Sequence, residues 1–311
     1  MAVKLQKPPY VFFGGKLRSW DEANFHISTE AVVRGLNVFE GLKAYWQRDG
    51  SIGLVAVERH WRRLQRSARL LHIPFEMTLE DFEANCHELV AKLCRSDSDI
   101  WVRATLYVVD GHWGEGTVSD LVLTAYHQPK VVPEPLDIGV STWRRSSDLA
   151  LPTRIKTSAN YLVARLGKIE GRSRGYTEMV VLNSAGRVAE ALGCCVVIVR
   201  DGVVITPPAS EGALESITVD IVEDLAKSMN VPFVRRPVDR SELYIADEMA
   251  LVGTLVEVTP VRSMDGLTFD PMRPIVSALT RRYFAAVRGE DPHERVDLSC
   301  RRVRVEAPEL V

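Results

Sequence analysis

Residues 154–162, RIKTSANYL, place Lys156 between an apolar, strand-like stretch and a segment that predicts a helix over about 158–173. Taken alone, a lysine at such a position is ordinarily a surface residue. A lysine acts as a nucleophile only when it is deprotonated, which burial and a cationic neighbourhood favour. The interpretation of Lys156 therefore depends on the motifs that accompany it along the chain.

Two neighbouring motifs have a physical interpretation of their own. GRVAEALG (186–193) holds Glu190 between two alanines in an apolar run, where a carboxylate is costly to bury unless it is paired. SITVDIVEDLAKSMN (216–230) predicts a helix with Ser216 as its N-cap. Free N–H groups and the helix dipole at such a start favour an anion. The second half of the chain thus carries a lysine, an acid that needs a partner and a candidate anion site.

Composition restricts the class of protein. The 311 residues are 46% hydrophobic and 26% charged, which is typical of a globular chain long enough for two domains. A net charge of -2 argues against a nucleic-acid surface, and no apolar run reaches the ~18 residues that span a bilayer. The N-terminus, MAVKLQKPPY, lacks the apolar core of a signal peptide. We expect a cytoplasmic protein with neither nucleic-acid nor membrane partners.

The five cysteines have no spacing typical of zinc or redox sites, so no metal site is predicted. Cys194 and Cys195 are adjacent in an apolar strand, where buried free thiols are expected. Free thiols agree with a reducing cytoplasm.

The segment HQPKVVPEP (127–135) predicts a domain boundary, because its three prolines remove backbone donors and disfavour helix. We expect a small N-terminal α/β domain over 1–128, a linker over 129–135, a large C-terminal domain over 136–288 and a charged, weakly ordered tail over 289–311. Amphipathic helices are predicted over 58–72 and 79–95. Both halves mix strands and helices without regular βαβ alternation, and neither GxGxxG nor GxxxxGK[ST] occurs, so nicotinamide-binding and ATP-loop folds are not predicted.

Six motifs share one order: VFEGLKAY (38–45), VERHWRRL (57–64), RIKTSANYL, GRVAEALG, GALESITVD (212–220) and GTLVEVTPV (253–261). Together they resemble the branched-chain aminotransferase group of class IV (fold type IV) pyridoxal-phosphate enzymes, over about residues 10–285. The resemblance implies a mixed α/β, two-domain fold of the D-amino-acid/branched-chain aminotransferase type, with pyridoxal 5'-phosphate as cofactor and Lys156 as its Schiff-base lysine. It implies transfer of an amino group between glutamate, a branched-chain or another α-amino acid and a 2-oxo acid. It also implies a homodimer or higher homo-oligomer.

The resemblance assigns a role to each matched position. Lys156 would be the catalytic residue, Tyr161 would hydrogen-bond the cofactor's phenolic oxygen, and Glu190 would face the pyridine nitrogen and keep it protonated. The remaining cofactor-binding positions are Arg59, Gly193, Leu214, Ile217, Thr218 and Thr254, of which Arg59, Ile217, Thr218 and Thr254 would hold the phosphate. The substrate-binding positions are Arg34, Phe39, Trp101, Arg103, Thr254 and Leu255, with Arg103 matching the arginine that receives the side-chain carboxylate of glutamate.

The chain departs from the family pattern near the substrate. Arg34 and Trp101 stand where the family usually has tyrosines, and residues 191–195, ALGCC, replace a glycine- and serine-rich stretch ending in asparagine. The loop 127–135 is short and lacks aromatic residues. We therefore hypothesise that Arg34 clamps a substrate carboxylate. The alternative is that Arg34 points outward or pairs with Glu40 or Asp21, since a buried arginine requires an anion.

Other functions fit the same motifs. Relatives with this fold include D-amino-acid and (R)-amine transaminases and lyases, and fold alone does not choose between them. A non-catalytic binding protein is a further alternative, which the joint presence of Lys156, Tyr161, Glu190 and Arg59 argues against. A yellow protein that borohydride bleaches would exclude it.

Overall fold

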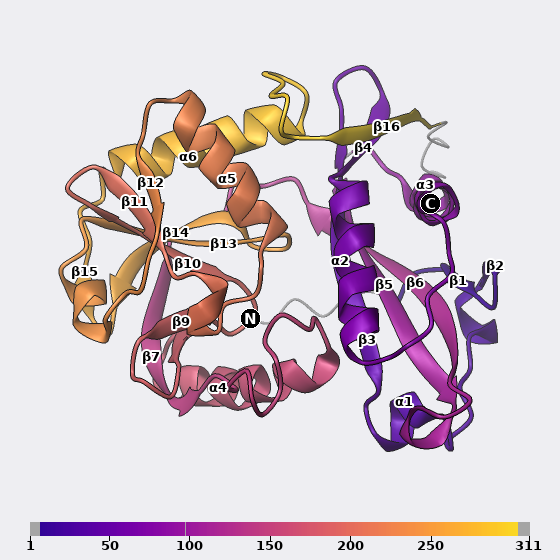
Figure 1. Ribbon diagram of the computed structural model, residues 1–311. Helices are drawn as coiled ribbons and strands as arrows, with labels where there is room; N and C mark the ends of the chain where they lie inside the picture. Colours follow the sequence, from indigo (N-terminus) through magenta and orange to yellow (C-terminus); the bar gives the residue numbers. More distant parts are fainter. Residues whose placement is uncertain (1–6, 97, 304–311) are drawn as a thin grey trace. The chain divides into compact units, whose positions relative to one another are not determined.

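The computed structural model describes residues 7–96 and 98–303 of the chain (Figure 1). These residues form two compact units. The first takes its described residues from Met1–Val131 and Ala286–Val311, and the second is Val132–Ala285. The start of the N-terminus and residues 304–311 of the expected tail lie outside the described residues. No helix within the described ranges is long and apolar enough to cross a membrane.

An antiparallel sheet in the order β16-β4-β3-β5-β6-β1-β2 organises the first unit. Its strands are β1 (Tyr10–Phe13), β2 (Lys16–Ser19), β3 (Asn37–Trp46), β4 (Ser51–Val55), β5 (Ser98–Asp110), β6 (Val118–Pro129) and β16 (Leu298–Arg302). Its helices are α1 (Glu30–Val33), α2 (Val57–Leu70) and α3 (Leu79–Leu93), with short 3₁₀ turns η1 (Trp20–Glu22) and η2 (His112–Gly114).

Successive side chains of β3 point to opposite faces of the sheet, and α2 covers one of these faces. Glu40 points to the side of the sheet covered by α2, where its carboxylate binds Arg63 through two hydrogen bonds of 2.6 and 2.7 Å. The Nδ1 atom of His60 lies 2.7 Å from the same carboxylate. Burial would raise the pKa of Glu40, but the Arg63 guanidinium and the His60 ring hold it far below its ordinary range. A buried ion pair thus links β3 to α2.

We expect Glu40→Gln to lower the free energy of unfolding by about 3–5 kcal/mol, because it leaves the buried Arg63 guanidinium without its anion. Denaturant unfolding near pH 7 measures the change. The loss should shrink below about pH 4, where a glutamate of the unfolded chain takes up its proton. Glu58→Gln is the matched control, since its exposed pair with Arg62 should contribute less than about 1 kcal/mol. Equal losses in both variants would contradict the expectation.

The second unit contains a mixed sheet in the order β12-β11-β10-β13-β14-β7-β8-β9, with β15 on β14. Its strands are β7 (Leu136–Arg144), β8 (Glu178–Leu182), β9 (Val188–Ala191), β10 (Cys195–Arg200), β11 (Val203–Thr206), β12 (Phe233–Arg235), β13 (Glu248–Gly253), β14 (Glu257–Met264) and β15 (Leu267–Thr268). Its helices are α4 (Leu162–Ser173), α5 (Ile217–Ser228) and α6 (Pro274–Val287), with 3₁₀ turns η3 (Ser158–Tyr161), η4 (Ala209–Glu211) and η5 (Arg240–Tyr244). Helix α6 leads the chain back into the first unit.

Buried aliphatic side chains from β7 to β14 form the core of the second unit, among them Ile138, Val196, Leu251 and Val261. Polar caps fix the helices on this core. The carboxylate of Glu248, which is 4% exposed, accepts hydrogen bonds from the amides of Ile275 and Val276 at the start of α6. Two orphan donors at the start of α6 are thereby satisfied.

The helices expected from periodicity are confirmed with small shifts at their ends: α2 and α3 correspond to 58–72 and 79–95, and η3 with α4 to 158–173. Ser216 is the N-cap of α5, as predicted, and its hydroxyl accepts from the Val219 amide. The expectation of a weakly ordered tail from residue 289 is wrong for its described part. Residues 298–302 form β16, which pairs with β4, as Figure 1 shows, because β4 would otherwise be an open edge.

Candidate active site

Lys156 lies on a loop that its neighbours hold tightly. Its Nζ atom donates to the Tyr161 hydroxyl at 2.9 Å, and Tyr161 ends the 3₁₀ turn η3. The side chain of Asn160, 2% exposed, donates to the carbonyls of Pro152 at 3.1 Å and Ile155 at 3.0 Å. The lysine and the tyrosine therefore meet on a rigid loop.

Glu190 is a buried acid on β9 with two partners. One carboxylate oxygen accepts from the Leu214 amide at 2.8 Å, and the other lies 2.9 Å from Nη2 of Arg145. Burial raises the pKa of Glu190, while Arg145, the Leu214 amide and the nearby Lys156 act in the opposite direction. Arg145 is therefore the partner that the sequence predicts for a buried Glu190.

No pattern in the sequence points to Arg145. It follows β7, and a run of Trp143, Arg144 and Arg145 gives no sign of which side chain turns inward. The sequence indicates that a buried Glu190 needs a cationic partner, but it does not indicate where in the chain that partner lies. Only the fold places Arg145, through the backbone bond from its amide to the Leu182 carbonyl.

The start of α5 has backbone N–H groups that a ligand could use. The Ser216 hydroxyl and carbonyl accept from the amides of Val219 and Asp220. The amides of Ile217 and Thr218 donate to no acceptor among the residues that the structure describes. These two N–H groups lie at the positive end of a 12-residue helix, which favours an anion such as a phosphate.

Three further predicted positions lie around these groups in the second unit. Thr254 and Leu255 form the turn between β13 and β14, with Leu255 47% exposed. A side chain at Gly253 would meet Cys194 at 3.1 Å, so this turn packs beside the segment of Gly193, which is itself exposed. The second unit thus contains the predicted positions Lys156, Tyr161, Glu190, Gly193, Leu214, Ile217, Thr218, Thr254 and Leu255, of which Glu190 lies near both Lys156 and Leu214.

The other predicted positions belong to the first unit, where β3 and β5 bring three of them onto one face. The register pairs Phe39 with Thr105 and Gly41 with Arg103. The Arg103 guanidinium lies 3.7 Å from the centre of the Phe39 ring, and its Nε donates to the Thr105 hydroxyl at 3.3 Å. The Trp101 indole leans over Gly41, where an added Cβ would lie 2.9 Å from Nε1. The glycine of VFEG therefore makes room for the tryptophan.

The two remaining arginines have partners within the first unit. Arg34 binds the Glu30 carboxylate at 2.5 and 2.7 Å and lies 5.3 Å from the centre of the Trp113 ring. Of the alternatives to a substrate clamp, pairing with Glu40 or Asp21 is wrong, because Arg34 pairs with Glu30 one turn earlier in the chain. Arg34 is exposed, which agrees with the alternative that it points outward. Arg59, in the first turn of α2, donates to the Arg295 carbonyl at 3.2 Å and is half-buried.

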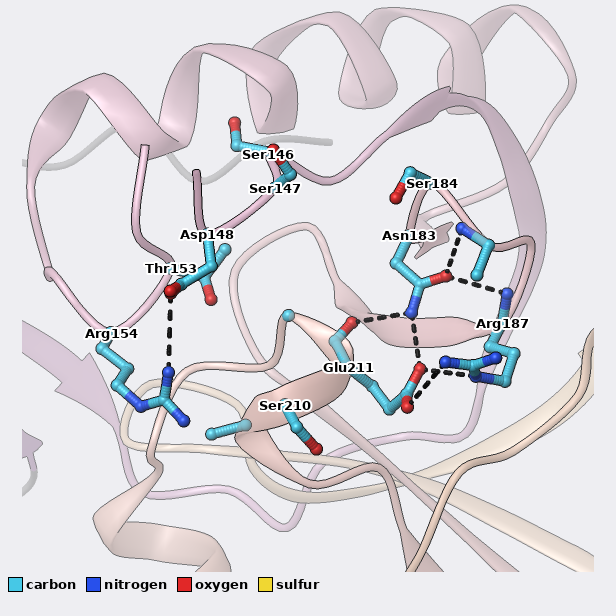
Figure 2. Close-up of a pocket in the computed structure, with 13 residues that line it drawn as sticks. Ser146, Ser147, Asp148, Thr153, Arg154, Asn183, Ser184, Arg187, Ser210 and Glu211 are labelled. Atoms are coloured by element: carbon cyan, nitrogen blue, oxygen red, sulfur yellow. Dashed lines mark hydrogen bonds and ion pairs between the residues drawn. The ribbon is translucent and has the colours of Figure 1, made fainter. Parts of the chain in front are cut away.

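A polar hollow of about 370 Å³ in the second unit is lined by residues 146–148 and 153–154, by the turn before β9, and by η4 with Gly212 (Figure 2). At its edge Glu211, 6% exposed, binds Arg187 at 2.7 and 3.0 Å and the Asn183 side chain at 2.6 Å. Glu211 is thus paired with its neighbours, and it offers an internal comparison for Glu190.

The geometry defines a class of protein: a lysine beside a tyrosine, a buried acid and a helix start with free amides. The family described as amino-transferase class IV matches residues 37–264, and the chain belongs to this family. Its members depend on pyridoxal phosphate, and the chain is a pyridoxal-phosphate-dependent aminotransferase that moves an amino group between an amino acid and a 2-oxo acid.

Known proteins support the same assignment. The chain is 30% identical over 296 residues to the branched-chain-amino-acid aminotransferase of Salmonella typhimurium, covering 92% of this chain and 95% of that protein. It is 33% identical over 290 residues to a probable branched-chain-amino-acid aminotransferase of Aquifex aeolicus, covering 90% and 93%. The crystal structure of the branched-chain aminotransferase from Thermobaculum terrenum in its pyridoxal-phosphate form matches with a TM-score of 0.84 at 33% identity, covering 92% and 96%. The expected mixed α/β fold is confirmed.

The residues present fit the cofactor. The free amides of Ile217 and Thr218 suit its phosphate, the buried carboxylate of Glu190 suits a protonated ring nitrogen, and the Lys156 amine suits its aldehyde.

Proposed function

We propose that Lys156 is the catalytic lysine of this aminotransferase and that Tyr161, Glu190 and the start of α5 hold its cofactor. The observation that carries the proposal is the 2.9 Å hydrogen bond from Lys156 to Tyr161, on a loop braced by the buried Asn160. When bound, pyridoxal phosphate supplies an aldehyde that links to amines and a ring that withdraws electrons from the substrate Cα.

The residues of the chain act around that chemistry. Once a substrate amine has taken its place, the Nζ amine of Lys156 is free to carry the proton that leaves Cα. The Tyr161 hydroxyl accepts from Nζ and so keeps the amine oriented. Glu190 holds a proton on the ring nitrogen, and Leu214 orients the Glu190 carboxylate. The amides of Ile217 and Thr218 and the Thr254 hydroxyl would hold the phosphate, and Arg59 is expected to bind it as well. An added Cβ at Gly193 would meet no atom within 4 Å, so this glycine would leave space for the cofactor.

A half-transamination screen tests this function. Each candidate amino donor is added to the purified protein, and the loss of the cofactor absorbance of the resting enzyme is followed. We expect L-leucine, L-isoleucine, L-valine and L-glutamate to react and to yield their 2-oxo acids. Reaction only with D-amino acids or with (R)-amines, or release of pyruvate without an acceptor, would contradict the proposed substrates and favour a different reaction of the family. No spectral change with any donor would contradict the catalytic role of Lys156.

Two observations support the proposed amino donors. The relatives reported above are branched-chain-amino-acid aminotransferases. On the β3–β5 face, Phe39 and Trp101 offer an apolar wall, and Arg103 offers a guanidinium for the second carboxylate of glutamate. Thr254 and Leu255 of the second unit remain expected substrate-binding positions. Arg34 contributes less to a carboxylate clamp than its position in the sequence suggested, because Glu30 already neutralises it.

We expect Arg103→Met to raise the KM for glutamate by about 10- to 100-fold, since a charge-assisted hydrogen bond to a carboxylate contributes roughly 1.5–3 kcal/mol. The KM for leucine should change little, because leucine has no second carboxylate. Steady-state kinetics with both donors measure the difference. Arg34→Met is the control and should leave the ratio of the two KM values unchanged; a shift in that ratio would restore the clamp hypothesis for Arg34.

We expect Arg59→Ala to weaken cofactor affinity by about 10- to 100-fold, because it removes a guanidinium that can bind two phosphate oxygens, worth roughly 1.5–3 kcal/mol. Dialysis should strip the cofactor faster from the variant, and added pyridoxal phosphate should restore activity. Arg62→Ala, three residues on in α2, pairs only with Glu58 among the residues described and serves as the control. Equal retention in both variants would make Arg59 a surface residue.

We further propose a cytoplasmic homodimer. Exposed apolar side chains gather on α1 and the neighbouring loops of the first unit, including Ile27, Val33 and Trp113 at 75%, 57% and 83% exposure. Exposed apolar side chains that lie together in this way are typical of protein–protein contact surfaces. The five cysteines are free thiols, which agrees with a reducing compartment. Analytical ultracentrifugation should give twice the chain mass; a monomer would contradict the dimer.

A further inference from the structure

One buried guanidinium joins three segments of the candidate site. The Arg145 side chain is 8% exposed. Besides the 2.9 Å contact of Nη2 with Glu190, its Nε donates to the Gly212 carbonyl at 3.2 Å and its Nη1 to the Asn160 carbonyl at 3.1 Å. A planar guanidinium can satisfy three acceptors in fixed directions, which a lysine amine at the same place cannot.

Each of the three acceptors lies next to a group that the proposed mechanism uses. Gly212 is two residues before Leu214, whose amide holds the other oxygen of Glu190. Asn160 directly precedes Tyr161, and its side chain binds the carbonyl of Ile155, beside Lys156. Gly212 has a φ of +95°, and a Cβ there would lie 3.3 Å from Cγ of Arg145, so the backbone is shaped closely around the arginine.

We propose that Arg145 is a positioning residue for transamination. It keeps the Glu190 carboxylate anionic and in a fixed orientation, and it fixes the backbone beside Tyr161. The inference rests on the proposed role of Glu190. Arg145 itself touches neither cofactor nor substrate in this assignment. It acts through Glu190 and through the turn η3.

The charges around Glu190 explain why it depends on Arg145. Burial favours the neutral carboxyl and raises its pKa, and the groups that oppose burial are Arg145, the Leu214 amide and Lys156. Cys194 also lies near Glu190, but burial raises the pKa of its thiol well above the ordinary value, so it stays neutral. Without Arg145 the carboxyl would lose its direct ion pair and would take up a proton, leaving no anion to hold a proton on the ring nitrogen.

The test compares Arg145→Met, Arg145→Lys, Glu190→Gln and the double variant Arg145→Met/Glu190→Gln, each loaded with pyridoxal phosphate. Two quantities are measured: the absorbance of the bound cofactor as a function of pH, and kcat and KM for one amino donor. Arg187→Met is the matched control, because Arg187 pairs with the buried Glu211 in the same unit (Figure 2).

We expect the pH profile of the Arg145→Met absorbance to match that of Glu190→Gln and to differ from the native profile. Its kcat should fall roughly 100-fold or more, the range found when one preorganised electrostatic group is removed. Its KM should change by less than about threefold, because the loss lies in the chemical step. The double variant should be no worse than Glu190→Gln, since residues that act as one unit are not additive. Arg145→Lys should recover part of the loss and shift the pH profile back towards the native one.

Each contrary outcome has a separate meaning. Independent, additive losses in the double variant would overturn the proposal, as would an Arg145→Met profile like that of the native enzyme or of Arg187→Met. If Arg145→Met fails to fold, the double variant decides: it leaves no buried charge alone, so it should fold and behave like Glu190→Gln. A double variant that also fails to fold would make Arg145 a general packing residue. Normal turnover of Glu190→Gln would instead remove the proposed role of Glu190 itself.

Discussion

Lys156→Ala is expected to lower the turnover of transamination by more than about 10⁴-fold, the upper range for a single positioned proton-transfer group, because Lys156 serves both as covalent anchor and as proton carrier. The fold should persist, since Lys156 is only half-buried and its Nζ atom donates to the hydroxyl of Tyr161. Non-covalent cofactor should remain bound, because the start of α5 does not depend on the lysine. Absorbance and thermal unfolding of the loaded variant measure both points.

Chemical labelling makes the assignment specific. Borohydride reduction of the native protein, followed by peptide mapping, should place the label on Lys156. Lys227→Ala is the activity control, since Lys227 is 58% exposed on α5 and pairs with Glu223. A label on Lys168, which lies on α4 and pairs with Glu178, would refute the assignment of Lys156.

Much of the fold could be predicted because its signals are local. The helices α2, α3 and α5 have continuous amphipathic periods or a clear N-cap, and those signals need no knowledge of the rest of the chain. Strand β16 could not be predicted. Its residues, LSCRR, lack an alternating apolar pattern, and it pairs with the edge of β4, which lies more than 240 positions earlier in the chain. Pairing of that kind is a property of the tertiary structure.

The same distinction holds for the candidate site. Lys156, Glu190 and the start of α5 could be proposed because each belongs to a motif and has a recognisable chemical need. Arg145 belongs to no motif, and its role depends on three contacts with segments 15, 45 and 67 positions away along the chain. For Arg34, the sequence left open whether the side chain is buried with an anion or points outward. The structure has Arg34 exposed, and the local conformation brings Glu30 within 2.7 Å of it.

Glu190→Gln is expected to lower kcat by about 10²–10³-fold, or roughly 2.7–4 kcal/mol of barrier, as for other preorganised electrostatic groups. The substitution keeps the shape of the side chain and leaves an oxygen for the Leu214 amide and Arg145 to bind, so the local packing should survive. What is lost is the negative charge, without which the ring nitrogen is largely unprotonated and the substrate Cα carbanion is poorly stabilised.

The affinity for the cofactor should change much less than kcat, because the phosphate contacts at α5 are untouched. Stopped-flow half-transamination isolates the chemical step, and equilibrium dialysis measures affinity. Glu211→Gln is the matched control: Glu211 is equally buried at 6% exposure, binds an arginine and an amide in the same unit, and lies in the hollow of Figure 2 rather than beside Lys156. If Glu211→Gln slows turnover as much as Glu190→Gln does, both losses reflect a disturbed core. A near-native kcat in Glu190→Gln would show that the ring nitrogen does not depend on this acid.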